Sequence, residues 1–222
     1  MPPSVFFQKI SKDSEIKKYI RPTFKQEIME YLFYFVEVFV CVAIVYVFLR
    51  TSVFDVIGIS GKSMFPNYND NDAIYIDQLT PKFSDYRRGD VVVLLSPAQA
   101  NGKKELYIKR IVGIPGDRVI FDGGKVYISN DNFAEPVELN ESSYLSSDIK
   151  TLKKVISTSD KFEEDRLGAN DYFVMGDNRG ASTDSRIFGK ISKSEIIGKE
   201  FYRILPMTKS GFFTLPKYNI SN

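Results

Sequence analysis

The stretch "DVVVLLS" at residues 90–96 is a short run of β-branched and aliphatic residues that begins at the end of the turn signal "RRGD". Runs of this kind, bounded by turn residues, are typical of β-strands. A second run of the same character, "ELYIKRIVGI" at residues 105–114, follows soon after it. The sequence therefore predicts two β-strands here, and the same pattern recurs on both sides.

Strand-like runs separated by turn signals such as "YNDND" and "PGD" recur through residues 51–206, except in the segment 130–170. The further predicted strands are "SVFDVIGI" (52–59), "AIYID" (73–77), a hairpin in "DRVIFDGGKVYIS" (117–129), "DYFVMGD" (171–177) and "EIIGKEFYRILP" (195–206). Many short strands with this punctuation favour a mainly β domain, built as a coiled or barrel-like antiparallel sheet. Residues 130–170 are polar and irregular, so we expect an insertion there, and residues 207–222 are expected to form a C-terminal tail.

The composition narrows the possible functions. With 222 residues the chain has room for one domain and some extra segments. Its formal net charge of +2 is too small to indicate nucleic acid as a partner. The chain has 0 His and a single cysteine, Cys41, so an intramolecular disulfide is excluded and a zinc site is not expected. We therefore expect neither a metal nor a cofactor.

An apolar segment, "YLFYFVEVFVCVAIVYVFL", covers residues 31–49 with one charged residue, Glu37. At about 1.5 Å per residue it would span roughly 28 Å, close to a hydrocarbon core of about 30 Å. A buried core helix and a cleaved signal peptide are the alternatives. The apolar part of a signal peptide is only about 7–15 residues long and ends at a small-x-small site, which this sequence lacks. The sequence thus predicts a transmembrane anchor helix over residues 31–50.

The charges on either side of this segment predict its orientation. Five Lys or Arg residues lie in residues 11–30, and two lie in residues 50–70. Positive residues favour the cytoplasmic side of a span. We therefore expect residues 1–30 in the cytoplasm, a single pass through the plasma (inner) membrane, and residues 51–206 as an extracytoplasmic domain.

In "GISGKSMFPNY", residues 58–68, Ser63 lies on a turn preceded by glycines. Serines in turns often hydrogen-bond their own backbone, which is one interpretation. If Ser63 is instead a nucleophile, the absence of His requires another base, and a neutral lysine amine can serve. Lys109 is the candidate, because its neighbours in the strand are apolar or aromatic and desolvation lowers the pKa of a lysine. A solvated lysine on the open face of a strand is the alternative.

Three blocks follow the apolar segment in order: "SGKSMFP" (60–66), "YIKRIVGIPGD" (107–117) and "FVMGDNRGASTDSRIFG" (173–189). Together they resemble bacterial type I signal peptidases, which are membrane-anchored serine endopeptidases with a Ser-Lys dyad. The resemblance spans residues 58–189, with 130–170 unmatched in detail. It implies that Ser63 is the nucleophile, that Lys109 is the general base, and that the hydroxyl of Ser182 holds the lysine amine in place.

The resemblance also implies supporting residues. Arg110, Asp184 and Arg186 match polar residues that buttress the site in this family, although an ordinary surface ion pair is the alternative for the last two. Met64 and Pro66 match the turn that aims the nucleophile. Asp177 and Asn178 are interpreted as a structural turn facing the same cluster.

The match is incomplete at Gly61. Many Gram-negative members have a serine two positions before the nucleophile, and its hydroxyl helps to stabilise the oxyanion. Gly61 occupies that position here, as in many Gram-positive-type members. The backbone N–H of Ser63 is then expected to carry more of this stabilisation.

The resemblance implies that the partners are signal peptides of exported preproteins, cut after small-x-small residues through an acyl-enzyme. We expect an extended peptide to bind a groove flanked by residues 58–62 and by the strand near residues 90–96. Apolar side chains near the site, including Met64 and Phe65, are expected to contact membrane lipid.

Two alternatives are kept. One is a self-cleaving repressor-type Ser-Lys peptidase, which normally carries a DNA-binding domain that residues 1–30 are too short to form. The other is a membrane-anchored binding or scaffold protein on an inactive peptidase fold.

Overall fold

The computed structural model describes residues 24–52, 54–96, 105–133, 135–152, 162–163 and 165–220. The chain separates into two units, with the boundary between Leu49 and Arg50. We call residues 50–222 the β unit, and the two units are described separately.

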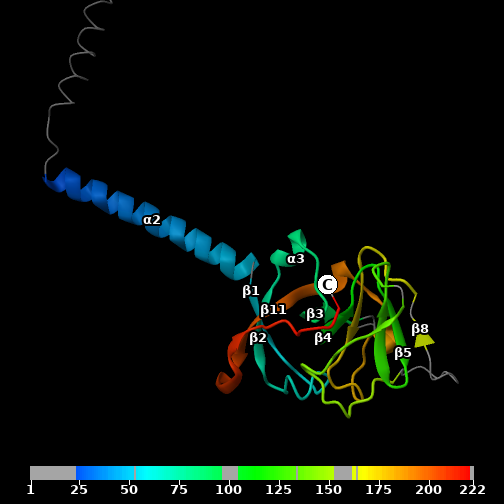
Figure 1. The fold of residues 1–222 in the computed structure, drawn as a ribbon. Helices are drawn as coiled ribbons and strands as arrows, with labels where there is room; N and C mark the ends of the chain where they lie inside the picture. Colours follow the sequence, from blue (N-terminus) through cyan, green and yellow to red (C-terminus); the bar gives the residue numbers. More distant parts are fainter. Residues whose placement is uncertain are drawn as a thin grey trace, which may run out of the picture. The chain divides into compact units, whose positions relative to one another are not determined.

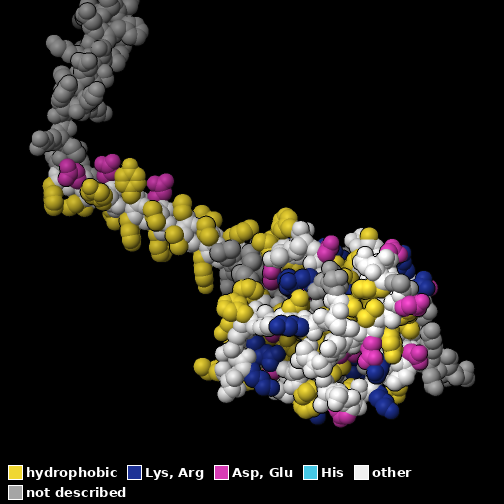
Figure 2. Space-filling view, viewed as in Figure 1, with side chains coloured by type: hydrophobic (Ala, Val, Ile, Leu, Met, Phe, Trp, Pro, Cys, Tyr) yellow, Lys and Arg dark blue, Asp and Glu magenta, His cyan; other side chains and the backbone are white. Residues whose placement is uncertain are grey.

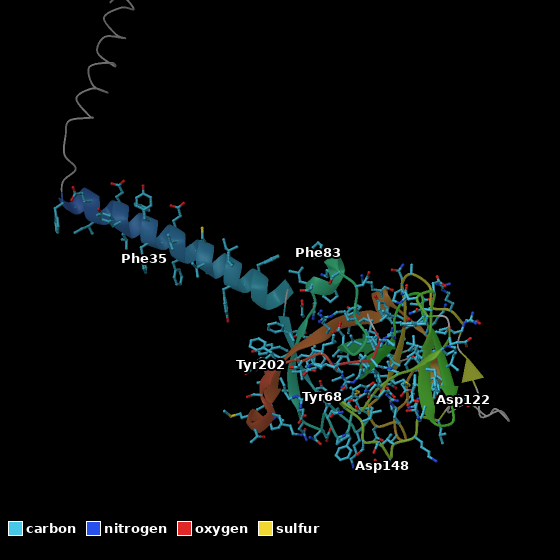
Figure 3. The ribbon with its side chains drawn as sticks, in the orientation of Figure 1. Phe35, Tyr68, Phe83, Asp122, Asp148 and Tyr202 are labelled. Atoms are coloured by element: carbon cyan, nitrogen blue, oxygen red, sulfur yellow. The ribbon has the colours of Figure 1, made fainter. Side chains whose placement is uncertain are left out.

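The described residues of the first unit belong to helix α2 (Phe24–Ser52), which starts seven residues before the predicted span and ends three residues past the unit boundary. Within the described chain it is the one helix long and apolar enough to cross a membrane, from Glu27 to Phe48. Apolar side chains cover it along its length (Figure 2), and Phe35 projects outward from it (Figure 3). A helix that is apolar over most of its surface needs an apolar environment, which a bilayer provides.

The described residues of the β unit form two antiparallel sheets (Figure 1). The larger sheet has the strand order β1-β2-β11-β3-β4-β9-β10, with β12 paired to β11, and the smaller has the order β7-β6-β5-β8. The larger sheet comprises β1 (Phe54–Gly58), β2 (Ala73–Asp77), β3 (Val91–Leu95), β4 (Leu106–Gly113), β9 (Asp171–Met175), β10 (Ile191–Ser192), β11 (Ile196–Leu205) and β12 (Gly211–Phe212). The mainly β, antiparallel fold class with an N-terminal apolar helix is confirmed.

The smaller sheet is built on the predicted hairpin. Its strands are β5 (Arg118–Asp122), β6 (Lys125–Ser129), β7 (Val137–Glu138) and β8 (Phe162–Glu163). Gly123 and Gly124 form the hairpin turn with φ values of +57° and +82°, which glycine adopts without strain. β7 and β8 come from the segment 130–170, which the sequence presented as irregular. Strands of two residues are too short to produce a periodic pattern, so they could not be predicted from the sequence.

Short helices complete the β unit. They are α3 (Thr80–Phe83), α4 (Ser185–Phe188), η1 (Lys193–Glu195) and η2 (Met207–Lys209).

Strand β3, which contains the apolar run "VVVLL", is buried on both faces. Val91 and Val93 pack into one hydrophobic cluster, and Val92 and Leu94 pack into another on the opposite face. Since successive side chains of a strand point to opposite faces, only a continuous apolar run can fill both clusters. β3 also pairs with strands on both edges, β4 and β11. It is therefore the rigid support for its neighbour β4.

The C-terminal tail packs on the β unit. Phe213 lies against the cluster that contains Val91 and Val93. Tyr218 and Ile220 pack into a third cluster, which includes residues of both sheets such as Phe173 and Val126. The tail thus links the two sheets.

Gly113 in β4 of the larger sheet packs against Val119 in β5 of the smaller sheet. A Cβ atom there would lie 2.7 Å from Val119 Cγ2, 2.9 Å from Leu167 Cδ1 and 3.0 Å from Phe173 Cβ. We predict that Gly113→Ala lowers the free energy of unfolding by about 1–3 kcal/mol, because the added methyl overpacks the core. Denaturant unfolding in detergent measures this. Gly58→Ala is the control, since nothing lies within 4 Å of its Cβ position; equal stability of both variants and the parent would contradict the prediction.

Candidate active site

Ser63 lies in the turn that follows β1. The N–H of Phe65 donates to Lys62 O (3.2 Å), and the N–H of Tyr68 donates to Met64 O (3.0 Å). Just before the turn, Gly61 has φ +95° and donates its N–H to Asp70 Oδ1 (2.8 Å). No atom lies within 4 Å of the position of a Cβ on Gly61, so its backbone conformation, rather than lack of space, favours glycine there.

Ser63 and Lys109 are in direct contact. The Nζ of Lys109 donates a hydrogen bond of 2.9 Å to Ser63 Oγ and another of 2.9 Å to Ile108 O. Lys109 is only 2% exposed and pairs with Val92 of β3. The ring of Tyr107 lies beside the amine, with its centroid 4.8 Å from Nζ. The alternative interpretation, that Lys109 is a solvated lysine on the open face of a strand, is therefore wrong.

The surroundings of Lys109 favour its neutral form. Burial lowers the pKa of Lys109 from 10.5 to about 8, and the charges of Asp184 and Asp177 oppose this decrease. The difference, at about 1.36 kcal/mol per pH unit, corresponds to a cost of about 3 kcal/mol for a charged amine at this position. At a pKa of about 8, roughly one Lys109 in ten is neutral at pH 7 and able to accept a proton.

Arg110 points to the opposite face of β4 from Lys109, as alternation along a strand requires. Its Nε and Nη2 donate to the two carboxylate oxygens of Asp177 at 2.9 Å and 2.7 Å, and both side chains are buried. The next residue in the loop after β9, Asn178, donates its backbone N–H to Ser63 O at 3.0 Å. The loop that contains Asp177 therefore connects the back of β4 to the turn that contains Ser63.

Asp184 and Arg186 form a second buried ion pair. Arg186 Nε and Nη2 donate to Asp184 at 2.9 Å and 2.7 Å, and both side chains are almost fully buried. Asp184 also accepts the N–H of Gly176 at 3.0 Å and that of Arg186 at the start of α4. Burial tends to raise the pKa of Asp184, but hydrogen bonds from Arg186 hold it below its ordinary value. The alternative of a surface ion pair is therefore wrong.

Ser182 lies against Gly176 and the Ser63 backbone. A Cβ on Gly176 would lie 2.2 Å from Ser182 Oγ and 2.4 Å from Ser63 O, so only glycine fits between them. Ser182 is buried, and its hydroxyl contributes to the low pKa of Asp184 through a hydrogen bond. Its contact with the Lys109 amine stays a prediction.

The expectation that Met64 contacts membrane lipid needs correction. Met64 is 1% exposed, and its sulfur accepts the N–H of Asp177 at 3.4 Å, so it is a core residue and does not reach a lipid surface. Phe65, in contrast, is 52% exposed.

The groove at Ser63 also has a different wall from the predicted one. A groove of about 490 Å³ is lined by residues 60–63 and 105–109, together with Ala181 and Thr183. The strand near residues 90–96 does not line it, because β3 is covered on both faces and paired on both edges. On β4, strand β9 pairs only with Arg110–Gly113, so Leu106–Lys109 extends past β9 and forms the wall.

Sequence reasoning missed several residues around the site. Asn67 and Tyr68 each connect the Ser63 turn to a charged residue far along the chain, Asp177 and Glu200 respectively. Arg179 forms a bidentate, buried pair with Glu141 of the 130–170 segment. Arg179 lies inside the third motif (173–189), so its place in the sequence could have indicated a role at the site. Nothing in the sequence connects partners more than 100 residues apart.

No group of three or more His, Cys, Asp or Glu side chains is placed to hold a metal ion in the described part of the chain.

Comparison with known proteins places the chain in a family. The family described as "Signal peptidase, peptidase S26" matches residues 32–205. A signal peptidase I of Bacillus amyloliquefaciens is 34% identical over 165 residues, which cover 73% of this chain and 82% of that protein. Signal peptidase IB of Staphylococcus aureus is 31% identical over 194 residues, covering 83% and 93% respectively. A crystal structure of a signal peptidase I from Enterococcus faecalis covers 52% of this chain and 97% of its own, at 23% identity and a TM-score of 0.35.

These relatives identify the chain as a serine endopeptidase, and its apolar N-terminal helix fits a membrane-anchored protein. The chain belongs to the signal peptidase family, peptidase S26.

We predict that Lys109→Met raises the free energy of unfolding at pH 7 by up to about 3 kcal/mol, because it removes a buried amine and keeps the volume. Below the folded-state pKa of about 8, both states of the parent hold the proton and the penalty is complete. Between about pH 8 and pH 10.5 only the unfolded state of the parent keeps the Lys109 proton. The free energy of unfolding of the parent therefore increases with pH, and its difference from that of Lys109→Met becomes smaller. Denaturant unfolding at several pH values measures this, with the exposed Lys82→Met as control. A variant less stable than the parent at pH 7 would contradict it.

Proposed function

We propose that this chain removes signal peptides from preproteins with Ser63 as the nucleophile and Lys109 as the general base. Membership of the signal peptidase family supports the activity and the class of substrate. The observation that carries the assignment of residues is the 2.9 Å hydrogen bond between the buried amine of Lys109 and the hydroxyl of Ser63. A base must lie within hydrogen-bond reach of the proton that it removes, and this pair meets that condition.

The reaction proceeds in two halves. Ser63 Oγ attacks the carbonyl carbon of the scissile peptide bond while neutral Lys109 takes the hydroxyl proton. Lys109 then donates this proton to the leaving amine, and an acyl-enzyme remains on Ser63. A water molecule, deprotonated by Lys109, attacks the ester, and the proton returns to Ser63 Oγ. Each half begins and ends with a neutral amine.

The negative charge of the tetrahedral intermediate needs hydrogen-bond donors. Among the described residues the backbone N–H of Ser63 has no hydrogen-bond partner, which suits it to this role. Gly61 offers no side-chain hydroxyl to assist it. Ser182, beside Gly176 and Ser63, is in a position suited to orienting the amine of Lys109 without the charge of a carboxylate.

The substrate is proposed to bind as an extended strand in the groove beside β4. Leu106–Lys109 extends past β9, so a peptide can pair with this half of the strand and bring its scissile bond to Ser63. Specificity for small-x-small residues would follow from shallow pockets in this groove.

The membrane arrangement is proposed from the sequence charges and helix α2. Residues 1–30 are cytoplasmic, residues 31–50 form a single span, residues 51–206 form the extracytoplasmic catalytic domain with its insertion at 130–170, and 207–222 form the tail. Membrane lipid is a partner, through the anchor and exposed apolar residues such as Phe65. Nucleic acid is not a partner. An inactive scaffold and a repressor-type peptidase are both less well supported, given the contact between Ser63 and Lys109 and the apolar helix.

We predict that signal-peptide cleavage rises with pH through an apparent pKa of about 8, since only neutral Lys109 can accept the serine proton. Lys109→Arg should be inactive, because a guanidinium does not deprotonate in proteins. A pH–rate profile on a signal-peptide substrate measures both, with Lys82→Arg as the matched surface control. Cleavage by the Lys109→Arg variant above background would remove Lys109 from the mechanism.

We also predict that the chain without residues 1–50 still folds and cleaves peptides, but reaches its full rate only with detergent or lipid. The β unit has its own hydrophobic clusters, and Phe65 beside the site is exposed.

Protease treatment of inverted membrane vesicles tests the orientation of the full chain. Digestion of the catalytic domain from the cytoplasmic side would reverse the proposed topology.

A further inference from the structure

The turn that begins with Ser63 ends with two residues, Asn67 and Tyr68, whose side chains enter separate buried ionic clusters. The exposed part of the turn, including Phe65 and Pro66, gives it little support of its own. The start of the turn is held by the loop after β9, where Asn178 N–H donates to Ser63 O and Asp177 N–H donates to the sulfur of buried Met64. How firmly Ser63 Oγ is held against Lys109 depends also on what fixes the end of the turn.

Asn67 connects the turn to the back of β4. Its Nδ2 donates to Asp177 Oδ2 at 2.9 Å and to Tyr144 O at 2.8 Å. Asp177 is the carboxylate that Arg110 binds through two hydrogen bonds. A continuous series of side-chain hydrogen bonds thus runs from the residue next to Lys109 to the residue four positions after Ser63.

Tyr68 connects the turn to β11. It is 2% exposed, and its hydroxyl donates to the carboxylate of Glu200, which is also buried. Arg203 lies over the Tyr68 ring, 4.1 Å from its centroid, and its Nη1 donates to Asn67 O at 3.0 Å. Burial raises the pKa values of both Tyr68 and Glu200, so the phenol remains a donor over the working range of pH.

We propose that Asn67 and Tyr68 are positioning residues that fix Ser63 at hydrogen-bond distance from Lys109. Asn67 ties the turn to the strand that carries the base, and Tyr68 ties it to β11 from the other side. The proposal rests on Ser63 being the nucleophile. A displacement of about 1 Å at a reacting atom can cost about 100-fold in rate, so losing either tie is expected to lower kcat.

The competing explanation is that these contacts only stabilise the fold. In that case variants would lose stability, but the folded fraction would react at the parent's rate. Measurements of kcat and KM well below each variant's melting temperature separate the two explanations. The pH–rate profile adds a second criterion, because a positioning residue changes the rate without changing the protonation of Lys109.

The first experiment uses Asn67→Leu, which keeps the approximate volume and removes the donor. In the full chain in detergent, we expect kcat for a signal-peptide substrate to fall about tenfold or more, with KM within about twofold of the parent. The apparent pKa of the profile should not change, since Asp177 remains paired with Arg110.

Asn219→Leu is the matched control. Asn219 also makes two hydrogen bonds between distant segments, to Glu138 O and from Asn140 N, both at 2.8 Å, and neither bond involves the turn or β4. It should leave kcat unchanged. A kcat for Asn67→Leu equal to that of Asn219→Leu, or a shifted apparent pKa, would overturn the role of Asn67 in positioning.

The second experiment removes a single oxygen atom, so it remains informative if Asn67→Leu does not fold. Tyr68→Phe should lower kcat, and Glu200→Leu should lower it to a similar extent. Glu200→Gln keeps an acceptor for the Tyr68 hydroxyl, so its kcat should be closer to that of the parent than to that of Glu200→Leu. The double variant Tyr68→Phe/Glu200→Leu should be no slower than either single variant. Tyr172→Phe, a buried tyrosine in another cluster, is the control.

Parent-like kcat in Tyr68→Phe, or additive losses in the double variant, would overturn the role of Tyr68. Ser63→Ala distinguishes failure of the proposed mechanism from failure of the positioning proposal. If Ser63→Ala still cleaves, the proposed mechanism itself is wrong. If it is inactive while Asn67→Leu and Tyr68→Phe react like the parent, only the positioning proposal fails.

Discussion

Burial of the Lys109 amine is the constraint on which the rest of the site depends. The chain contains no histidine, so the proposed nucleophile Ser63 needs another base, and Lys109, the base proposed here, has an ordinary pKa far above neutral pH. Placing that base in the apolar environment beside Val92 and Tyr107 brings its pKa to about 8. The cost, about 3 kcal/mol, is a large fraction of the stability of a typical domain. The fully buried strand β3 gives the rigidity that such a position needs.

The carboxylates near the amine follow from the same constraint. Asp177 and Asp184 both favour the protonated form of Lys109, and an unpaired carboxylate there would work against a neutral base. Each is paired with an arginine, Arg110 and Arg186, which partly offsets its charge. The arginines therefore serve the electrostatics of the base as well as the geometry of the loops.

Buried ion pairs of this kind contribute little net stability, because desolvation offsets most of their attraction. Their effect here is to fix segments that are remote in sequence. Arg110 joins β4 to the loop at Asp177, and Arg179 joins the same loop to Glu141 of the insertion. The insertion at 130–170, polar in sequence, thereby becomes part of the scaffold behind the site. Two short strands from the same segment, β7 and β8, extend the smaller sheet.

The sequence by itself determined the class of fold, the apolar helix and the pairing of Ser63 with Lys109. Local patterns specify these features: alternating and continuous apolar runs define strands, and three motifs in order define a family. Tertiary structure alone decided which wall lines the groove, that Met64 is buried, and that Asn67 and Tyr68 link the turn to Asp177 and Glu200. Those contacts join residues 110 and 132 positions apart, and their energies arise only when sheet packing removes water from around them.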